Sequence, residues 1–384
     1  MGHAFAVGHV YVERVMMYNF WKSSGNSESD MERIVYLLGA GSTRGEMAHA
    51  GIESDITMKG IGENVLRLSE KKAGQYSKLH RDFGLPENQD IEIMMSLLEG
   101  FTEAEASEFK EVCNEVRQLF RSYLITEICE KKVRPRIFGS LLHLHKSYGE
   151  KMGRSGEELT GVLTVNYDSL ADEAFMLVHK GINYGYKFTS DTYPRADDVP
   201  PLIKLHGSFN WKVQRRSLTV SRTFEERGYP DDCSGWMPPS VFKRPPTAFR
   251  AIWIRAAQLV TNCDVLRVIG SSLRNEDFAL LSLVFVSQLK SRLPFSIELI
   301  VPDKDALGED ASEGKDGQMT GIMQRLPFLG KLRNLSSLSV FAKESHIAEN
   351  VFYSWVLMKV REIEGNTGRS MNDDFIGREL LLEV

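Results

Sequence analysis

Short apolar runs recur along the chain, and most of them are separated by segments with helical periodicity. The apolar runs have the length of buried strands and lie at 34–38, 162–165, 202–205, 265–269, 297–301 and 335–341. The segments with helical periodicity lie at 170–178, 248–260, 277–289 and 346–360. Strands that alternate with helices are typical of α/β proteins, so the pattern predicts a doubly wound, Rossmann-like, mostly parallel sheet.

Between the first two of these strands the periodicity changes. Helical patterns at 90–98, 102–128 and 137–145 predict a helical insertion over residues 84–150, whereas the polar stretch 51–84 predicts a loop or short helices. Residues 209–213 and 218–220 predict a hairpin. The expected organisation is an N-terminal arm and linker at 1–30, one domain over 31–360 that contains the insertion, and a tail at 361–384.

Composition narrows the class of protein without identifying it. The 384 residues are 42% hydrophobic and 26% charged, which is ordinary for a globular domain. A net charge of −5 gives no global attraction to nucleic acid or to an anionic membrane, and no apolar run reaches the roughly 18 residues of a membrane span. Cys113, Cys129, Cys233 and Cys263 are widely separated, which predicts a cytoplasmic protein without a structural zinc site.

Small and polar residues follow several predicted strands at their carboxyl ends, where open α/β sheets bind ligands. A glycine turn, Gly39-Ala40-Gly41-Ser42, follows the first strand and is of a kind that brings backbone amides close to a pyrophosphate. A purely structural turn explains it equally well, because Gly45 falls one residue late for a dehydrogenase fingerprint. The other strand-end residues are Asn166, Asp168, His206, Gly270, Ser271, Ser272 and Asp303. Taken singly, they are equally well explained as turn residues and a buried histidine.

The strand-end clusters occur in the order and rough spacing of the sirtuin signature. The longer strings over 163–168 (LTVNYD) and 204–211 (KLHGSFNW) resemble those of bacterial sirtuin-like NAD hydrolases of anti-phage defence. This resemblance extends over roughly residues 34–341. The four-cysteine zinc module of the sirtuin deacylases is missing, because only Cys233 and Cys263 lie between the His-Gly cluster and the Gly-Ser-Ser-Leu turn.

The resemblance implies a role for each matching residue. Asn166 would position a water near the nicotinamide ribose, and His206 would act on the ribose hydroxyls as general base or orienting group. Asp168 would brace the loop between them. The remaining matches would bind the pyrophosphate, the riboses or the adenosine end of NAD: Gly39, Ala40, Gly41, Ser42, Gly270, Ser271, Ser272 and Asp303.

The expected function is hydrolysis of NAD, as substrate, to nicotinamide and ADP-ribose. An NAD-dependent protein deacylase and a non-catalytic sensor of NAD or ADP-ribose remain the alternatives. An NAD hydrolase needs control, so we expect a homo-oligomer and a partner in trans. The resemblance favours a HerA-type ATPase over an Argonaute-type partner. The arm at 4–21, the helices at 90–147 and the apolar tail at 375–382 are the expected contact surfaces.

Overall fold

The computed structural model describes most of the chain. The described residues are 8–12, 15–19, 31–54, 56, 58–72, 91–103, 107–153, 155–188, 194–214, 217–220, 234–240, 246–271, 273, 278–291, 295–301, 335–343 and 350–368. Within these ranges no helix is long and apolar enough to cross a membrane.

An eight-stranded sheet forms the centre of the molecule, in the order β1-β2-β10-β9-β8-β3-β4-β5. Six neighbouring strands are parallel: β3 (Glu32–Leu38), β4 (Glu157–Thr164), β5 (Leu202–Lys204), β8 (Val265–Ile269), β9 (Phe295–Ile300) and β10 (Leu335–Lys343). From β3 the chain proceeds to β4 and β5 on one side, and later to β8, β9 and β10 on the other. The prediction of a doubly wound, mostly parallel α/β sheet is therefore confirmed, with its switch point between β3 and β8.

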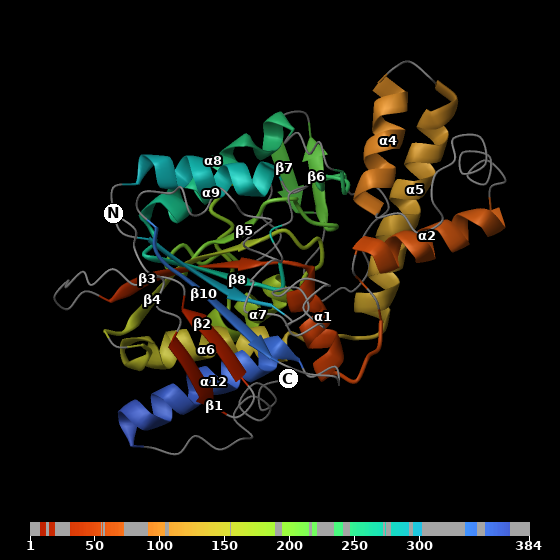
Figure 1. Cartoon of the computed structure of the whole chain (residues 1–384). Helices are drawn as coiled ribbons and strands as arrows, with labels where there is room; N and C mark the ends of the chain where they lie inside the picture. Colours follow the sequence, from red (N-terminus) through yellow and green to blue (C-terminus); the bar gives the residue numbers. More distant parts are fainter. Residues whose placement is uncertain are drawn as a thin grey trace, which may run out of the picture.

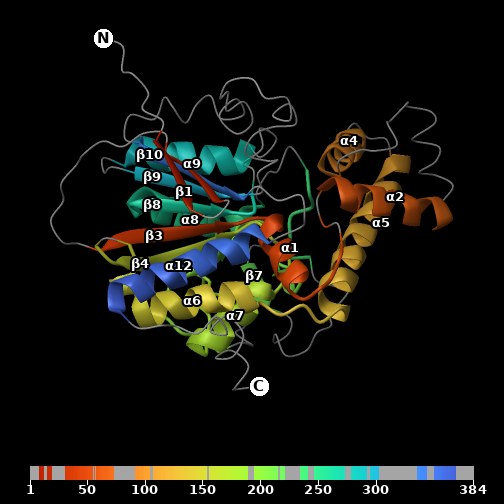
Figure 2. The ribbon, with the colours of Figure 1, turned by 60° about the horizontal axis from the view of Figure 1, so that its bottom comes forward.

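Helices cover both faces of this sheet, as Figures 1 and 2 show. One face is covered by α8 (Arg250–Asn262) and α9 (Phe278–Lys290), and the other by α6 (Arg136–Tyr148), α7 (Leu170–His179) and α12 (Val351–Thr367). The central strands are mainly apolar because both faces are covered, and every residue of β8 is buried, including Arg267. Helix α1 (Ala40–His49) leaves the carboxyl end of β3 at the switch point.

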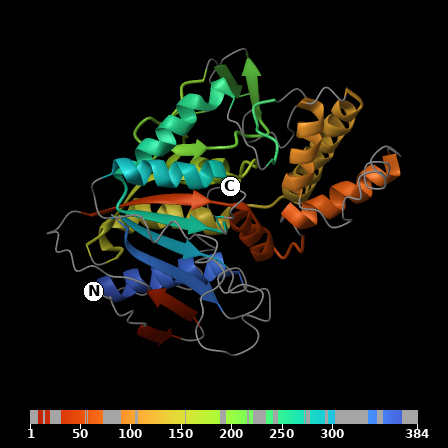
Figure 3. The same ribbon diagram turned by 45° about the horizontal axis from the view of Figure 1, so that its top comes forward.

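A separate helical unit projects from the carboxyl edge of the sheet (Figures 1 and 3). It consists of α2 (Met58–Lys72), α4 (Ile91–Glu103) and α5 (Ser107–Ile125), and a π-helical turn (Thr126–Glu130) extends α5. We refer to these elements as the helical unit. They share a second hydrophobic core with the site loops, distinct from the core around the sheet.

The helical unit differs from the expected insertion at both of its ends. Helix α6 belongs to the sheet layer, because Ile137, Leu141 and Leu142 are completely buried in the sheet's core. Helix α2 lies in the stretch that was predicted as a loop or short helices. Its buried Ile61 and Val65 are four residues apart, but glycine and charged residues between and around them obscure that period in the sequence.

Two further boundaries also differ from expectation. The predicted arm contains β1 (Gly8–Val12) and β2 (Val15–Asn19), an antiparallel pair in which β2 pairs with the edge of β10. Helix α12 begins later than predicted and ends seven residues beyond 360, because Asn350 caps its start by accepting a hydrogen bond from Tyr353 N and Gly368 ends it at φ +64°. The predicted hairpin is present as β6 (Trp211–Gln214) and β7 (Ser217–Val220).

A buried ionic network joins the central strands beneath α12. Arg267 on β8 is 1% exposed and donates two hydrogen bonds to the carboxylate of Glu157 on β4, at 2.5 and 2.7 Å. Burial alone would raise the pKa of Glu157, but the charge and hydrogen bonds of Arg267, helped by Lys359, hold that pKa well below its usual range. Burial lowers the pKa of neighbouring His145 to about 3, so its ring is neutral. Its Nε2 forms a hydrogen bond with Tyr36 Oη at 2.7 Å.

Candidate functional site

The two turns on either side of the switch point are in direct backbone contact. Gly39 N donates to Ile269 O at 2.9 Å, and Gly41 N donates to Gly270 O at 2.8 Å. A Cβ on Gly39 would lie 2.6 Å from Gly270 O, and one on Gly41 would lie 2.7 Å from Gly270 Cα. Gly270 itself has φ +66°, which disfavours any side chain. The close approach of the two turns therefore requires all three glycines, independently of any bound phosphate.

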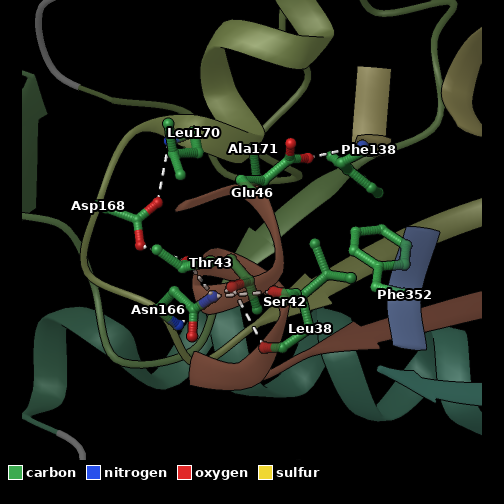
Figure 4. Close-up of a pocket in the computed structure, with 11 residues that line it drawn as sticks. Leu38, Ser42, Thr43, Glu46, Phe138, Asn166, Asp168, Leu170, Ala171 and Phe352 are labelled. Carbon is green, nitrogen blue, oxygen red and sulfur yellow. Dashed lines mark hydrogen bonds between the residues drawn. The ribbon is translucent and has the colours of Figure 1, made fainter. Parts of the chain in front are cut away.

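Asn166 is held by its side-chain amide nitrogen. That nitrogen donates to Gly39 O at 3.0 Å. It also donates to Ser42 Oγ at 3.2 Å and to Thr43 Oγ1 at 3.0 Å (Figure 4). Because a backbone carbonyl only accepts hydrogen bonds, the contact with Gly39 fixes the nitrogen toward α1 and the amide oxygen on the opposite branch. Asn166 thus connects the end of β4 to the first turn of α1 with a single side-chain orientation.

Asp168 joins the same loop to two helices. Its Oδ2 accepts from Thr43 Oγ1 at 2.9 Å, and its Oδ1 accepts from Leu170 N at 3.0 Å at the start of α7. Through this second bond Asp168 accepts from the first backbone N–H of α7, although Ser169 occupies the cap position itself. Burial raises the pKa of Asp168, while the positive charge of Lys204 partly offsets that rise.

Lys204, at the end of β5, is fully buried beneath this loop. Its ammonium group donates to Asp168 O at 2.5 Å and to Asp172 Oδ2 at 2.6 Å. Tyr184 Oη donates to the other carboxylate oxygen of Asp172 at 2.5 Å. A buried cation therefore binds the loop after β4 to β5, two residues before His206.

His206 is buried, and its ring is anchored to the residue that precedes Asn166. Its Nδ1 lies 3.1 Å from Val165 O. Since that carbonyl can only accept, Nδ1 carries the proton in the neutral ring, and Nε2 is then the basic nitrogen. The ring also packs against Tyr167, with centroids 5.8 Å apart. The two predicted catalytic residues are thus joined through consecutive residues of one loop.

A small pocket opens beside Asn166, between α1, α6, α7 and α12 (Figure 4). Its polar residues are Ser42, Thr43, Glu46, Thr164, Asn166 and Asp168, and its apolar residues are Leu38, Phe138, Leu170, Ala171 and Phe352. Glu46 accepts from Ile137 N at 3.0 Å and from Phe138 N at 2.7 Å. Burial outweighs these two amide donors and raises the pKa of Glu46 to about 8.

The structure brings most of the predicted site residues to one edge of the sheet. Gly39, Ala40, Gly41, Ser42, Asn166, Asp168, Gly270 and Ser271 lie at or beside the switch point, and His206 is linked to them through Val165. Ser272 and Asp303 lie outside the described residues. Within those residues, no group of three or more His, Cys, Asp or Glu side chains is arranged to hold a metal ion.

Sequence reasoning missed Thr43, Glu46 and Lys204 as site residues. Thr43 and Glu46 lie on α1, three and six residues after Ala40, and no local pattern marks them. Lys204 carries a usable signal, because a lysine at the end of an apolar strand is rarely buried without a partner. The fold and site define an α/β protein whose polar groups converge at a topological switch point.

Comparisons with known proteins add structural likeness only. No known family profile matches the chain, and neither does any curated protein. Among solved structures, it is similar to a Sir2 homolog–NAD complex at 14% identity, with 88% of this chain and 91% of that chain covered and a TM-score of 0.39. A Sir2–p53 peptide–NAD⁺ complex has 14% identity, coverage of 89% and 95%, and a TM-score of 0.37. At such values the likeness carries no inference about activity, which has to come from the site's own residues.

Proposed function

We propose that this chain hydrolyses NAD to nicotinamide and ADP-ribose at the switch point of its sheet. The observation that carries the proposal is the joint anchoring of Asn166 and His206. The amide nitrogen of Asn166 is held by Gly39 O and two hydroxyls, and the Nδ1 of His206 is held by Val165 O. An oriented amide oxygen can position a water, and a histidine with a basic Nε2 can accept the proton that this water loses when it attacks NAD.

The bond to be broken makes modest demands on the protein. Nicotinamide leaves as a neutral molecule because the electron pair of the N-glycosidic bond returns to the positively charged pyridinium ring. The ribose becomes oxocarbenium-like, as in glycoside hydrolysis. Water adds its oxygen to the anomeric carbon and loses one proton. In our proposal Asn166 orients that water, and His206 Nε2 accepts the proton.

The surrounding residues would hold this pair in place. Asp168 and Thr43 fix the loop of Asn166 against α1, and Lys204 fixes the same loop against β5. The glycine turn presents the start of α1 to the same edge, although Gly41 N is bonded to Gly270 O in this structure. Binding of an NAD pyrophosphate at that turn would therefore replace this backbone contact.

The test is incubation of the purified chain, and of any complex it forms with a partner, with NAD alone, followed by chromatography of the products. We expect nicotinamide and ADP-ribose from the native chain, and a loss of at least about a hundredfold in Asn166→Ala and in His206→Ala. Two matched controls are Asn262→Ala, an asparagine on α8 that bonds only within its helix, and His143→Ala, a partly exposed histidine on α6. Both controls should retain activity.

Other results would point to other functions. Consumption of NAD only when an acylated peptide is supplied would assign the site to a protein deacylase. Binding of NAD without consumption would assign it to a sensor. Full turnover in both Asn166→Ala and His206→Ala, with native melting curves, would remove these residues from the site.

A further inference from the structure

The site loop after β4 faces two different cores with alternating side chains. Asn166 and Asp168 contact α1, whereas Tyr167, which lies between them, is 5% exposed and belongs to the core of the helical unit. One short loop thus carries the predicted catalytic amide on one side and an anchor to the helical unit on the other. Asn166 and Tyr167 share a peptide bond, so a shift of the Tyr167 backbone also shifts Asn166.

Phe120 of α5 is the residue of the helical unit that makes a ring contact with this anchor. It is fully buried, and its ring meets Tyr167 edge to face, with centroids 5.5 Å apart at 88°. Edge-to-face pairs are directional, so the ring of Phe120 restricts the tilt of Tyr167 in a way that an aliphatic side chain does not.

The loop that carries His206 is attached to the same ring. Phe209 stacks on Tyr167 with centroids 5.3 Å apart at 13°, and Phe209 N donates to Tyr167 O at 3.2 Å. Ser208 Oγ donates to the same carbonyl at 3.2 Å. Since His206 itself packs on Tyr167, both loops of the candidate site contact this one residue, through its ring and its carbonyl.

We propose that Phe120 is a positioning residue, through which the helical unit sets the relative placement of Asn166 and His206 by way of Tyr167. The inference rests on the proposed function for its kinetic consequence, but the coupling itself is a property of the fold. Displacements near 1 Å are enough to lower a reaction rate about a hundredfold when two groups must meet a substrate together. The helical unit then influences the candidate site through Phe120, although none of the residues that line the described pocket belongs to this unit.

The first experiment compares Phe120→Leu with Val116→Ala. Val116 lies one turn earlier on α5, in the same core, and is equally buried. We expect Phe120→Leu to lower kcat for NAD at least tenfold with KM changed less than twofold, and Val116→Ala to leave kcat within twofold. Tyr167→Leu, which removes the ring, should reproduce the loss. Equal losses of kcat in Phe120→Leu and Val116→Ala would overturn the proposal by reducing it to general destabilisation.

A second readout does not depend on activity. Amide hydrogen exchange of the segment 164–169 should become faster in Phe120→Leu and remain native in Val116→Ala. Unchanged exchange in Phe120→Leu would overturn the coupling, whether or not the chain cleaves NAD. Faster exchange in a chain whose native form leaves NAD intact would support the coupling while removing the proposed function.

Discussion

Replacement of Lys204 by methionine should be the most informative single change beneath the site. Methionine has nearly the length of lysine but lacks the charge. The buried carboxylate of Asp172 would lose its bond from the Lys204 ammonium and keep the bond from Tyr184 Oη. Both members of the pair are 0% exposed, so water does not compensate for the loss. Removing one partner of a buried pair costs about 3–5 kcal/mol.

This cost converts into a measurable melting shift. At about 2.1 cal/mol/K per residue, 384 residues give an unfolding entropy near 0.8 kcal/mol/K, so the melting temperature should fall by about 4–6 °C. Calorimetry and urea unfolding measure the change. Lys146→Met is the matched control, because Lys146 also donates to a backbone carbonyl, Val178 O, but is exposed. That control should change stability by less than about 0.5 kcal/mol.

A combined variant separates the charge from the geometry. Lys204→Met together with Asp172→Leu and Tyr184→Phe removes the whole polar group, and it should recover most of the lost stability. NAD hydrolysis should stay impaired, because the bond from Lys204 to Asp168 O is still absent. A loss below about 1 kcal/mol in Lys204→Met alone would refute the reasoning, since it would mean that water or another cation reaches Asp172.

Two further predictions concern the glycine turn and the pocket. Gly270→Ala should lower the free energy of unfolding by about 3 kcal/mol or more and abolish NAD turnover, because a Cβ there collides with the backbone of Ser42. Gly368→Ala is the control: at φ +64° and with no neighbour within 4 Å, it should lower the free energy of unfolding by only about 1–2 kcal/mol. Urea unfolding measures both losses, and equal losses would contradict this account. The folded-state pKa of Glu46 is raised to about 8, so its contribution to stability is greatest below about pH 4.5 and is lost as the pH rises to 8. Between pH 5 and pH 8 the free energy of unfolding, measured with urea, should therefore fall by up to about 4 kcal/mol more in the native chain than in Glu46→Gln. The same dependence on pH in both proteins would contradict this prediction.

The sheet was predictable because its chemistry is local. A strand buried on both faces needs a mainly apolar run, and residues 34–38 of β3 and 265–269 of β8 show such runs in the sequence, with Arg267 as the exception. The helical unit was less predictable. Whether a helix covers the sheet or leaves it depends on which partner buries its apolar face, and the sequences of α2 and α6 do not specify that partner. Strands β1 and β2 were missed because β2 pairs with β10, more than three hundred residues away, and β1 pairs with β2.

Some residues of the candidate site could likewise be predicted from the sequence, and others could not. Asn166, His206 and the glycines were found because small and polar residues at strand ends converge at one edge of a parallel sheet. Lys204 and Glu46 act through partners distant in sequence, which only the fold brings near. Tyr167 was quoted as part of a motif, yet its packing against Phe120 of the helical unit could not be read from the motif.

The position of β3 between β4 and β8 has a consequence for how the site comes into being during translation. Arg33 on β3 pairs with Asp264, which directly precedes β8 and lies 231 positions later in the chain. At about 5–20 residues per second, ribosomal synthesis of that interval takes roughly 10–50 s. Until β8 emerges, the glycine turn after β3 has no Gly270 turn to pack against. A nascent chain, or one that ends before β8, therefore lacks one wall of the candidate site, and the site is complete only after Gly270 has been synthesised.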